Sequence, residues 1–299
     1  MSDSPIETII TPVSHDLGAF KVRRSLPTRG RTMVGPFIFI DQFGPSRLAP
    51  GEGMDVRPHP HINLATVTYL FDGAINHRDS LGSFQTIEPG AINLMTAGSG
   101  IVHSERSPDD KRAAGPGFYG MQTWLALPDG KEEIAPAFEH VRPDALPLVE
   151  GAGVSARVLM GELWGVRAAT TCHSPTIYAY LMLGANATVM IEAEADERAI
   201  LLTEGAATID GVLVALFDLV ILAPGHRATL RASAASRAML LGGGAFATPR
   251  HVFWNFVSSS RDRIEQAKED WRSGRFPLVP GDEAEHIPLP DVPLTVSYP

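Results

Sequence analysis

The sequence of 299 residues contains a single cysteine, Cys172, so no disulfide can form within the chain and the fold does not depend on an oxidising compartment. No uninterrupted apolar run approaches the roughly 20 residues that a membrane-spanning helix needs. Residues 1–5 lack the basic segment and apolar core of a signal peptide. We therefore expect a cytoplasmic protein that does not bind a membrane.

Positive charge is also scarce. The chain has 25 Lys and Arg residues against 34 Asp and Glu residues, which gives a formal charge of −9. Nonspecific binding to nucleic acid needs a basic surface that displaces counterions from the phosphates. An acidic chain is equally disfavoured at an anionic membrane surface. We therefore expect no direct nucleic-acid partner.

Glycine and proline are plentiful, at 28 and 24 residues, and aromatic residues make up only 7%. This composition favours many short strands joined by tight turns. Residues 66–71 are rich in β-formers, and the Asp72-Gly73 pair that follows predicts a hairpin turn into a returning strand at 74–77. Residues 91–95 predict another strand, and the glycine-rich bend 96–100 leads into Ile101-Val102-His103.

A fainter copy of this plan follows later in the chain, where residues 199–205 resemble the strand that ends at Gly73 and residues 222–225 resemble the Pro89-Gly90 turn. We therefore expect two related β-units. Counting equal offsets in the second copy places only apolar residues where the first copy has histidines and a glutamate. Those positions are Ile191, Ala193, Ala238 and Leu240. The second unit is thus expected to pack and support.

The expected domains are an N-terminal β-unit over residues 1–130, a linker over 131–147 and a C-terminal β-unit over 148–299. Near the end of the chain, Ser259 with Asp262 predicts a helix start at about residue 260. An apolar stripe follows, and Gly274 predicts a stop near residue 273, before an extended tail. The stripe consists of Ile264, Ala267 and Trp271.

Two matched motifs in the first unit carry the chemistry. In His59-Pro60-His61 and in His103-Ser104-Glu105, the ligand-type residues stand two positions apart, so on a strand both point to the same face. If two such strands faced each other inside a barrel, three imidazoles and one carboxylate would converge. That donor set suits Fe, Mn, Co, Ni, Cu or Zn but not Ca or Mg, and it leaves coordination sites open for chemistry.

Simpler interpretations exist for each histidine. The histidines of an isolated His-x-His motif more often lie at the surface or make hydrogen bonds. Here the second motif, with the same strand-compatible spacing, favours a metal site. His77 is expected to stabilise a turn or lie at the surface rather than ligate. Cys172 beside His173 resembles a nucleophile pair, but adjacent strand residues face opposite sides.

The metal motifs, together with Thr66-Val67-Thr68-Tyr69-Leu70, His77-Arg78-Asp79-Ser80-Leu81-Gly82 and the run from Met95 to Glu105, resemble the pirin family of the cupin superfamily. The resemblance is dense from about residue 35 to 127. It implies an all-β bicupin of two stacked antiparallel, jelly-roll barrels with a short C-terminal helix. It also implies one divalent metal, usually Fe(II), held in the N-terminal barrel by His59, His61, His103 and Glu105, and an empty C-terminal barrel.

Some pirins are quercetin 2,3-dioxygenases, so the resemblance suggests an enzyme that opens flavonols with O2, in which Glu105 accepts the proton of the substrate hydroxyl. Other pirins are regulators, and a redox-responsive iron protein that acts through a protein partner is the alternative. We expect a monomer. The chain departs from many pirins at Ala65, where a Glu is common, so the resemblance does not define the pocket mouth or the substrate preference.

Overall fold

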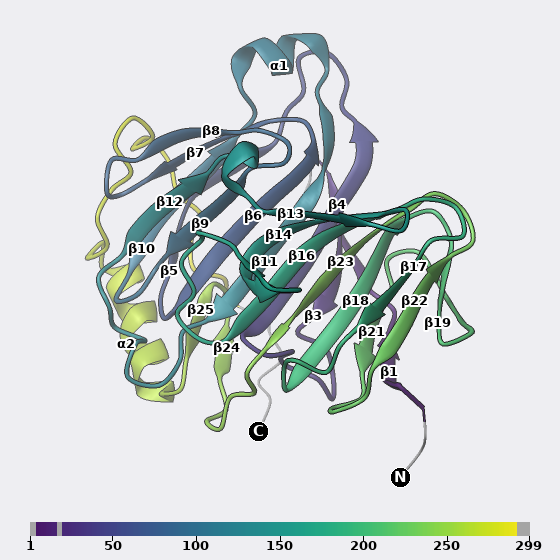
Figure 1. Ribbon diagram of the computed structural model, residues 1–299. Coiled ribbons are helices and arrows are strands. Elements are labelled where there is room, and N and C mark those ends of the chain that lie inside the picture. The colour runs from purple at the N-terminus through teal and green to yellow at the C-terminus, as the bar shows by residue number, and fades with distance from the viewer. Residues whose placement is uncertain (1–3, 17–19, 292–299) are drawn as a thin grey trace. The chain divides into compact units, whose positions relative to one another are not determined.

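The computed structural model describes residues 4–16 and 20–291, which form mostly β-strands joined by turns (Figure 1). The described chain divides into two compact units that interleave along the sequence. We call residues 14–16, 20–32, 38–142 and 247–291 the histidine unit, because both metal motifs lie there. Residues 4–13, 33–37 and 143–246 are called the apolar unit.

The histidine unit is a sandwich of a larger and a smaller antiparallel sheet rather than a closed barrel. The larger sheet runs in the order β12 (Ala137–Val141), β9 (Ile92–Thr96), β6 (Leu64–Asp72), β11 (Gly117–Ala126), β4 (Phe37–Arg47), β3 (Lys21–Leu26), β2 (Val13–Asp16). The smaller sheet runs in the order β5 (Asp55–His61), β10 (Ile101–Arg106), β7 (Ile75–Asp79), β8 (Phe84–Ile87). The remaining elements are α1 (Asp109–Ala114), the hairpin β24 (His251–Phe253) and β25 (Phe256–Ser258), and α2 (Arg261–Arg272).

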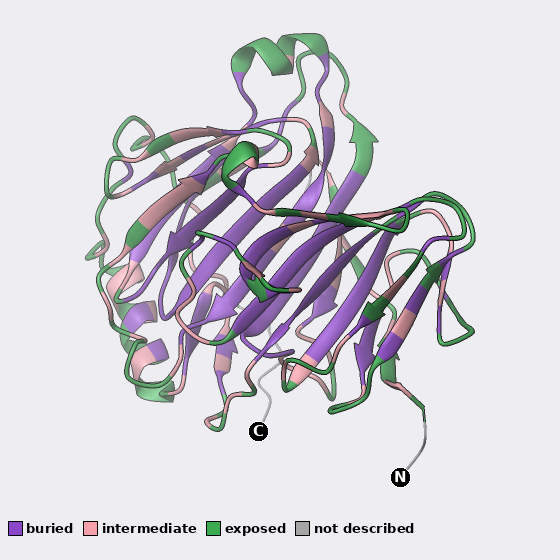
Figure 2. Ribbon diagram, in the orientation of Figure 1, coloured by how far each residue is buried: buried purple, intermediate pink, exposed green. Residues whose placement is uncertain are grey.

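The apolar unit repeats this plan. Its larger sheet runs in the order β1 (Ile6–Ile10), β21 (Leu219–Leu222), β18 (Glu197–Glu204), β23 (Ser236–Gly243), β16 (Thr176–Leu183), β14 (Val154–Leu163), β13 (Leu148–Gly151), with β15 (Val166–Arg167) paired to β14. Its smaller sheet runs in the order β17 (Thr188–Ile191), β22 (Ala228–Ala232), β19 (Ala207–Ile209), β20 (Val212–Val214). A short 3-10 helix, Pro143–Ala145, precedes β13. Figure 2 shows the central strands buried along most of their length and α1 exposed.

The predicted strands at 66–71, 74–77 and 91–95 correspond to β6, β7 and β9, but the predicted hairpin at Asp72-Gly73 is wrong. Strand β6 pairs with β9 and β11 in the larger sheet, whereas β7 pairs with β8 and β10 in the smaller one. The turn therefore carries the chain from one sheet to the other. Gly73 fits there because its φ of 94° favours glycine and a Cβ would lie 2.3 Å from the carbonyl oxygen of Gly117.

The predicted C-terminal helix is confirmed as α2, with one change at its start. Ser260, not Ser259, is the N-cap, and its hydroxyl accepts a hydrogen bond from the Arg263 amide at 3.3 Å. Ile264 and Ala267 are buried as the apolar stripe predicts, and they pack with Ile62 and Phe256 of the histidine unit.

The two smaller sheets align strand for strand, and this alignment corrects the offset comparison. Strand β17 corresponds to β5 and β22 to β10, since Ile191 pairs with Ala228 as His61 pairs with Ile101. The counterparts of the metal motifs are therefore Val189 for His59, Ile191 for His61, Leu230 for His103 and Ala232 for Glu105. Ala238 and Leu240 lie instead on β23 of the larger sheet. The residues differ from those counted, but every counterpart is still apolar.

The compact units also differ from the consecutive domains expected at 1–130 and 148–299. Strand β1 pairs with β21 of the apolar unit, and the segment 247–291, which includes α2, belongs to the histidine unit. Strand pairing and burial at α2 decide this arrangement, and neither follows from position along the chain. Among the described residues, no helix is long and apolar enough to cross a bilayer.

Candidate metal centre

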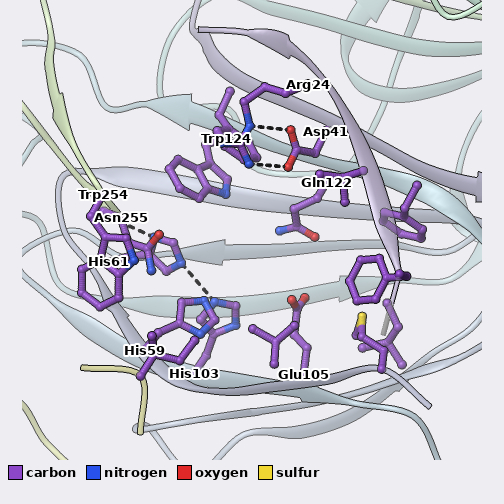
Figure 3. Close-up of a pocket in the computed structure, with 18 of the residues that line it drawn as sticks. Arg24, Asp41, His59, His61, His103, Glu105, Gln122, Trp124, Trp254 and Asn255 are labelled. Carbon is purple, nitrogen blue, oxygen red and sulfur yellow. Dashed lines mark hydrogen bonds and ion pairs between the residues drawn. The ribbon is translucent and has the colours of Figure 1, made fainter. Parts of the chain in front are cut away.

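The two metal motifs lie on neighbouring strands rather than facing strands. Strand β5 is the edge of the smaller sheet and pairs antiparallel with β10, with His103 directly opposite His59 and Ile101 opposite His61. Proline cannot donate to a sheet ladder, so Pro58 and Pro60 suit this edge position. Alternation along each strand then turns the histidines to one face, toward the interior between the two sheets (Figure 3).

Within the described part of the chain, His59, His61 and His103 form a group whose ligand atoms all lie within 4.8 Å of one another. The Nε2 atoms of His61 and His103 are 3.1 Å apart, and the ring centroids of His59 and His103 are 4.3 Å apart. All three side chains are buried. Three buried imidazoles this close together could hold a metal ion.

Hydrogen bonds to the backbone set the tautomers of His59 and His61. The Nδ1 of His59 lies 2.8 Å from the Arg57 carbonyl oxygen, and the Nδ1 of His61 lies 3.1 Å from that of Asn255. A carbonyl oxygen can only accept, so each Nδ1 carries the hydrogen and each Nε2 presents a lone pair. This is the usual arrangement of a metal-ligating histidine, whose other nitrogen donates to an outer partner.

The donor geometry and protonation also fit a transition metal. Two nitrogens held about 2.1 Å from one ion at a right angle are about 3 Å apart, which matches the His61–His103 contact. Burial lowers the pKa of His59 to about 4 and lowers the pKa of His61 and His103 well below 6.5, and neighbouring imidazoles lower all three pKa values further. The rings are therefore neutral near pH 7, as metal binding requires.

Glu105 lies in the same cavity but is not a member of the histidine group. The irregularity in the β5–β10 pairing lies on β5, where Val56 stands opposite Glu105, whereas β10 pairs with β7 in unbroken register, so His103 and Glu105 project to the same face of β10. Burial raises the pKa of Glu105, and His77 and a hydrogen bond from Thr68 partly offset this effect. Its role as a fourth ligand stays a prediction.

A cavity of about 240 Å³ lies between the two sheets, with the histidines and Glu105 on one side. Its opposite wall comes from the larger sheet, where Phe39 and Trp124 stack at 3.9 Å between ring centroids and an angle of 11°. Arg24 and Asp41 add an ion pair to this wall (Figure 3). The rest of the lining is largely apolar. Such a pocket suits a small aromatic molecule with few polar groups.

The β24–β25 hairpin contributes residues that sequence reasoning missed. Its turn places Trp254 and Asn255 in the cavity wall, and Asn255 supplies the carbonyl that orients His61. Trp254 has a φ of 51°, which is uncommon for a bulky residue and marks a tight turn. The short apolar runs on both sides of Trp254-Asn255 could have predicted a hairpin, but no local pattern connects that hairpin to residue 61.

One expectation about an individual residue needs correction. His77 is not at the surface: it is 2% exposed, its Nε2 lies 3.0 Å from Asp79, and its ring stacks on Phe138 at 4.4 Å. Ala65 is buried in β6 and is not among the residues that line the cavity. The Cys172 thiol donates to the Thr170 carbonyl at 3.6 Å in the apolar unit.

The pirin family profile matches residues 19–125, and the profile of the pirin C-terminal cupin domain matches residues 178–277. This chain belongs to the pirin family. A pirin-like protein of Caulobacter vibrioides is 45% identical over 96% of this chain and 100% of its own length. A Pseudomonas aeruginosa protein provisionally named quercetin 2,3-dioxygenase is 38% identical over 94% of this pirin and 88% of its own length.

Solved structures agree with this pirin assignment. The crystal structure of quercetin 2,3-dioxygenase from Acinetobacter baumannii superposes with a TM-score of 0.89 at 34% identity, covering 97% of this chain and 96% of that one. A bacterial pirin from Escherichia coli in complex with nickel(II) shares the fold, with a TM-score of 0.62 at 18% identity over 80% of this chain and 99% of that one.

Proposed function

We propose that this pirin is a metal-dependent dioxygenase that opens flavonols such as quercetin with O2. The observation that carries the proposal is the neutral histidine cluster at one side of a mostly apolar, aromatic-walled cavity. The similarity to quercetin 2,3-dioxygenase from Acinetobacter baumannii over nearly the whole of both chains supports it.

His59, His61 and His103 would hold one divalent transition metal, with Glu105 as the proposed fourth ligand. Three nitrogen donors argue against Ca and Mg, and we propose Fe(II), with Mn, Co, Ni, Cu or Zn as the other metals that such donors accept. When bound, the metal would polarise the 3-hydroxyl oxygen of the flavonol and favour its ionised form.

Glu105 would accept the proton of that hydroxyl at a carboxylate oxygen. Glu105 lines the cavity beside the histidines, and burial raises its pKa. A general base is more efficient when its pKa is closer to the working pH, so this shift favours the role. The stacked Phe39 and Trp124 rings line the cavity and would pack against the flavonol ring system. The apolar lining would keep bulk water from the reacting centre.

The test is direct. The protein is purified and loaded in turn with Fe, Mn, Co, Ni or Cu, and loss of quercetin absorbance is followed under oxygen beside a metal-loaded His103→Ala control. We expect turnover with at least one metal and none with the control. If no metal gives turnover above the control, the dioxygenase proposal fails.

A second variant separates the two roles proposed for Glu105. In Glu105→Gln, loss of the base alone lowers kcat by about 10²–10⁴-fold while metal content stays at the level of the unaltered protein. Loss of a ligand lowers metal content as well. Elemental analysis beside the quercetin assay distinguishes these results, and full activity with full metal content would contradict both roles.

A further inference from the structure

An ion pair lies in the cavity wall, and the chemistry at the histidine cluster does not use it. Arg24 on β3 donates from Nε and Nη2 to the two carboxylate oxygens of Asp41 on β4, at 2.8 and 2.7 Å. The Arg24 side chain is 21% exposed and that of Asp41 is 6% exposed. Burial removes much of the solvation of both charges, and this cost can cancel their attraction, so such a pair often adds little to stability.

The pair is connected to the metal cluster by a continuous row of rings. The Arg24 guanidinium lies 4.3 Å from the centroid of the Phe39 ring, and Phe39 stacks on Trp124. The Trp124 and His61 rings then meet in a T-shaped contact, with 5.0 Å between their centroids. Figure 3 shows the pair on the far side of the cavity from the histidines, with Gln122 between it and Glu105. A planar molecule that lies along this wall with one end at the histidines would therefore direct its other end to the pair.

The ion pair also indicates which chemical group the far end of that molecule should carry. Among the described residues, Asp41 takes the protons of Nε and Nη2 of Arg24, which leaves the Nη1 protons for an acceptor on a ligand. The Asp41 carboxylate can still accept a further hydrogen bond. Donor and acceptor side by side match a hydroxyl group, which accepts and donates at once. Because Asp41 neutralises the guanidinium, a neutral group fits better than an anion.

We propose that Arg24 and Asp41 recognise a phenolic hydroxyl on an outer ring of the substrate and so select hydroxylated flavonols over the bare flavonol skeleton. This inference rests on the proposed function for the end of the substrate that meets the metal. Arg24 and Asp41 determine specificity and take no part in the ring opening.

The experiment compares quercetin with 3-hydroxyflavone, which has the same skeleton and 3-hydroxyl but no hydroxyl on either outer ring. Dissociation constants are measured on the metal-loaded protein, without oxygen, by quenching of tryptophan fluorescence, since Trp124 and Trp254 line the cavity. We expect quercetin to bind roughly 10–100-fold more tightly, the usual effect of a hydrogen bond to a charged group. Equal affinities would overturn the proposal.

The double variant Arg24→Met/Asp41→Leu removes both charges together, which avoids an unpaired buried ion. It should bring the two affinities within about threefold of each other. Arg23→Met is the matched control, because Arg23 sits next to Arg24 on β3 but donates instead to Gln42 and the Gly44 carbonyl. If the double variant does not fold, Arg24→Lys serves in its place, since it retains the charge but loses the two-point contact with Asp41.

A preference for quercetin that survives in the double variant, or in Arg24→Lys where that replaces it, would overturn the assignment to this pair. A preference that falls equally in Arg23→Met would do the same. The experiment measures binding, so its outcome is separate from that of the proposed function. Absence of turnover with every metal contradicts the dioxygenase proposal. The ratio of the two dissociation constants alone decides whether Arg24 and Asp41 form the subsite.

Discussion

The Nδ1 of His61 donates to the carbonyl of Asn255, a residue 194 positions later in the sequence. That single contact fixes which nitrogen of His61 faces the cluster. His59 is fixed locally, by the carbonyl of Arg57 two residues away. The orientation of the histidine cluster thus depends partly on β5 itself and partly on the distant β24–β25 hairpin.

Replacing one of the proposed metal ligands should remove metal without unfolding the chain. We predict that His61→Ala lowers metal affinity at least about 100-fold, since losing even an outer partner of a ligand typically costs 10–100-fold. The β-structure should survive, because each unit has its own apolar core. Elemental analysis and circular dichroism measure the two effects, with His226→Ala, an exposed histidine of the apolar unit, as the matched control. A His61 variant that unfolds would make the site structural.

At the scale of elements, the C-terminal segment closes the exposed edge of β5. The Ile287 amide donates to the Pro58 carbonyl at 2.9 Å, and the Trp271 indole of α2 donates to the Ile287 carbonyl at 3.0 Å. The Ile287 side chain lines the cavity. An edge strand that contains two prolines is thereby paired and covered, and the wall of the cavity depends on a segment after the last helix.

Asp282 anchors that segment, so its attachment should depend on pH. Two hydrogen bonds from Arg106, at 2.8 Å each, are the main reason why the pKa of Asp282 lies below 3.8. A carboxyl whose pKa is lowered by folding stabilises the folded state above its unfolded pKa, and this contribution is lost as pH falls through the folded pKa. The contact should hold at neutral pH and weaken below about pH 4.

We predict that Asp282→Asn lowers the protection of the Ile287 amide against hydrogen exchange at pH 7. The difference from the unaltered protein should shrink below about pH 4, where Asp282 itself becomes protonated. Glu285→Gln, which removes a more exposed partner of Arg106, is the control and should have a smaller effect. Equal protection in both variants at pH 7 would show that Asp282 does not hold the segment.

At the scale of the whole molecule, the same sheet plan occurs twice, with polar residues on the smaller sheet of one unit and apolar residues at the matching positions of the other. Around His103, strand β10 pairs with β7, which carries His77 and Asp79; the counterparts in the apolar unit are Ala207 and Ile209, paired with Ala232 and Leu230. The apolar counterparts all belong to one buried core. The histidine unit thus has a buried polar cluster where the apolar unit has an apolar core.

This difference predicts how acid affects the metal-free protein. Folding lowers the pKa values of His59, His61 and His103, so below about pH 6.5 the unfolded chain binds protons that the folded chain does not. Stability should therefore fall as pH drops from about 6.5 toward 4, by up to about 1.4 kcal/mol per pH unit for each histidine. Denaturant unfolding at several pH values measures this slope. A His103→Ala variant with an unchanged slope would contradict the assignment.

The apolar copy should respond to packing alone. We predict that Leu230→Ala lowers the free energy of unfolding by about 2–5 kcal/mol, because it leaves a cavity in a fully buried core. Metal content per folded chain should not change. Leu213→Ala on β20, where the leucine is 72% exposed, is the control and should stay within about 0.5 kcal/mol. Metal loss in Leu230→Ala would show that the apolar counterpart does affect the cluster.

The sequence alone determined the pieces that follow from local periodicity. The two-residue spacing of His59 and His61 aligned their side chains on one strand face, and the apolar stripe of Ile264 and Ala267 predicted the buried face of α2. Both depend only on how a strand or a helix projects neighbouring side chains.

Tertiary structure decided everything that depends on which segments meet. It made β5 and β10 neighbours rather than facing strands, moved the Asp72-Gly73 turn between sheets, and left Glu105 outside the histidine group. It also brought Asn255 and Ile287 to the cavity from the far end of the chain. Long-range strand pairing is set by the summed burial of two whole sheets, so no short stretch of sequence contains it.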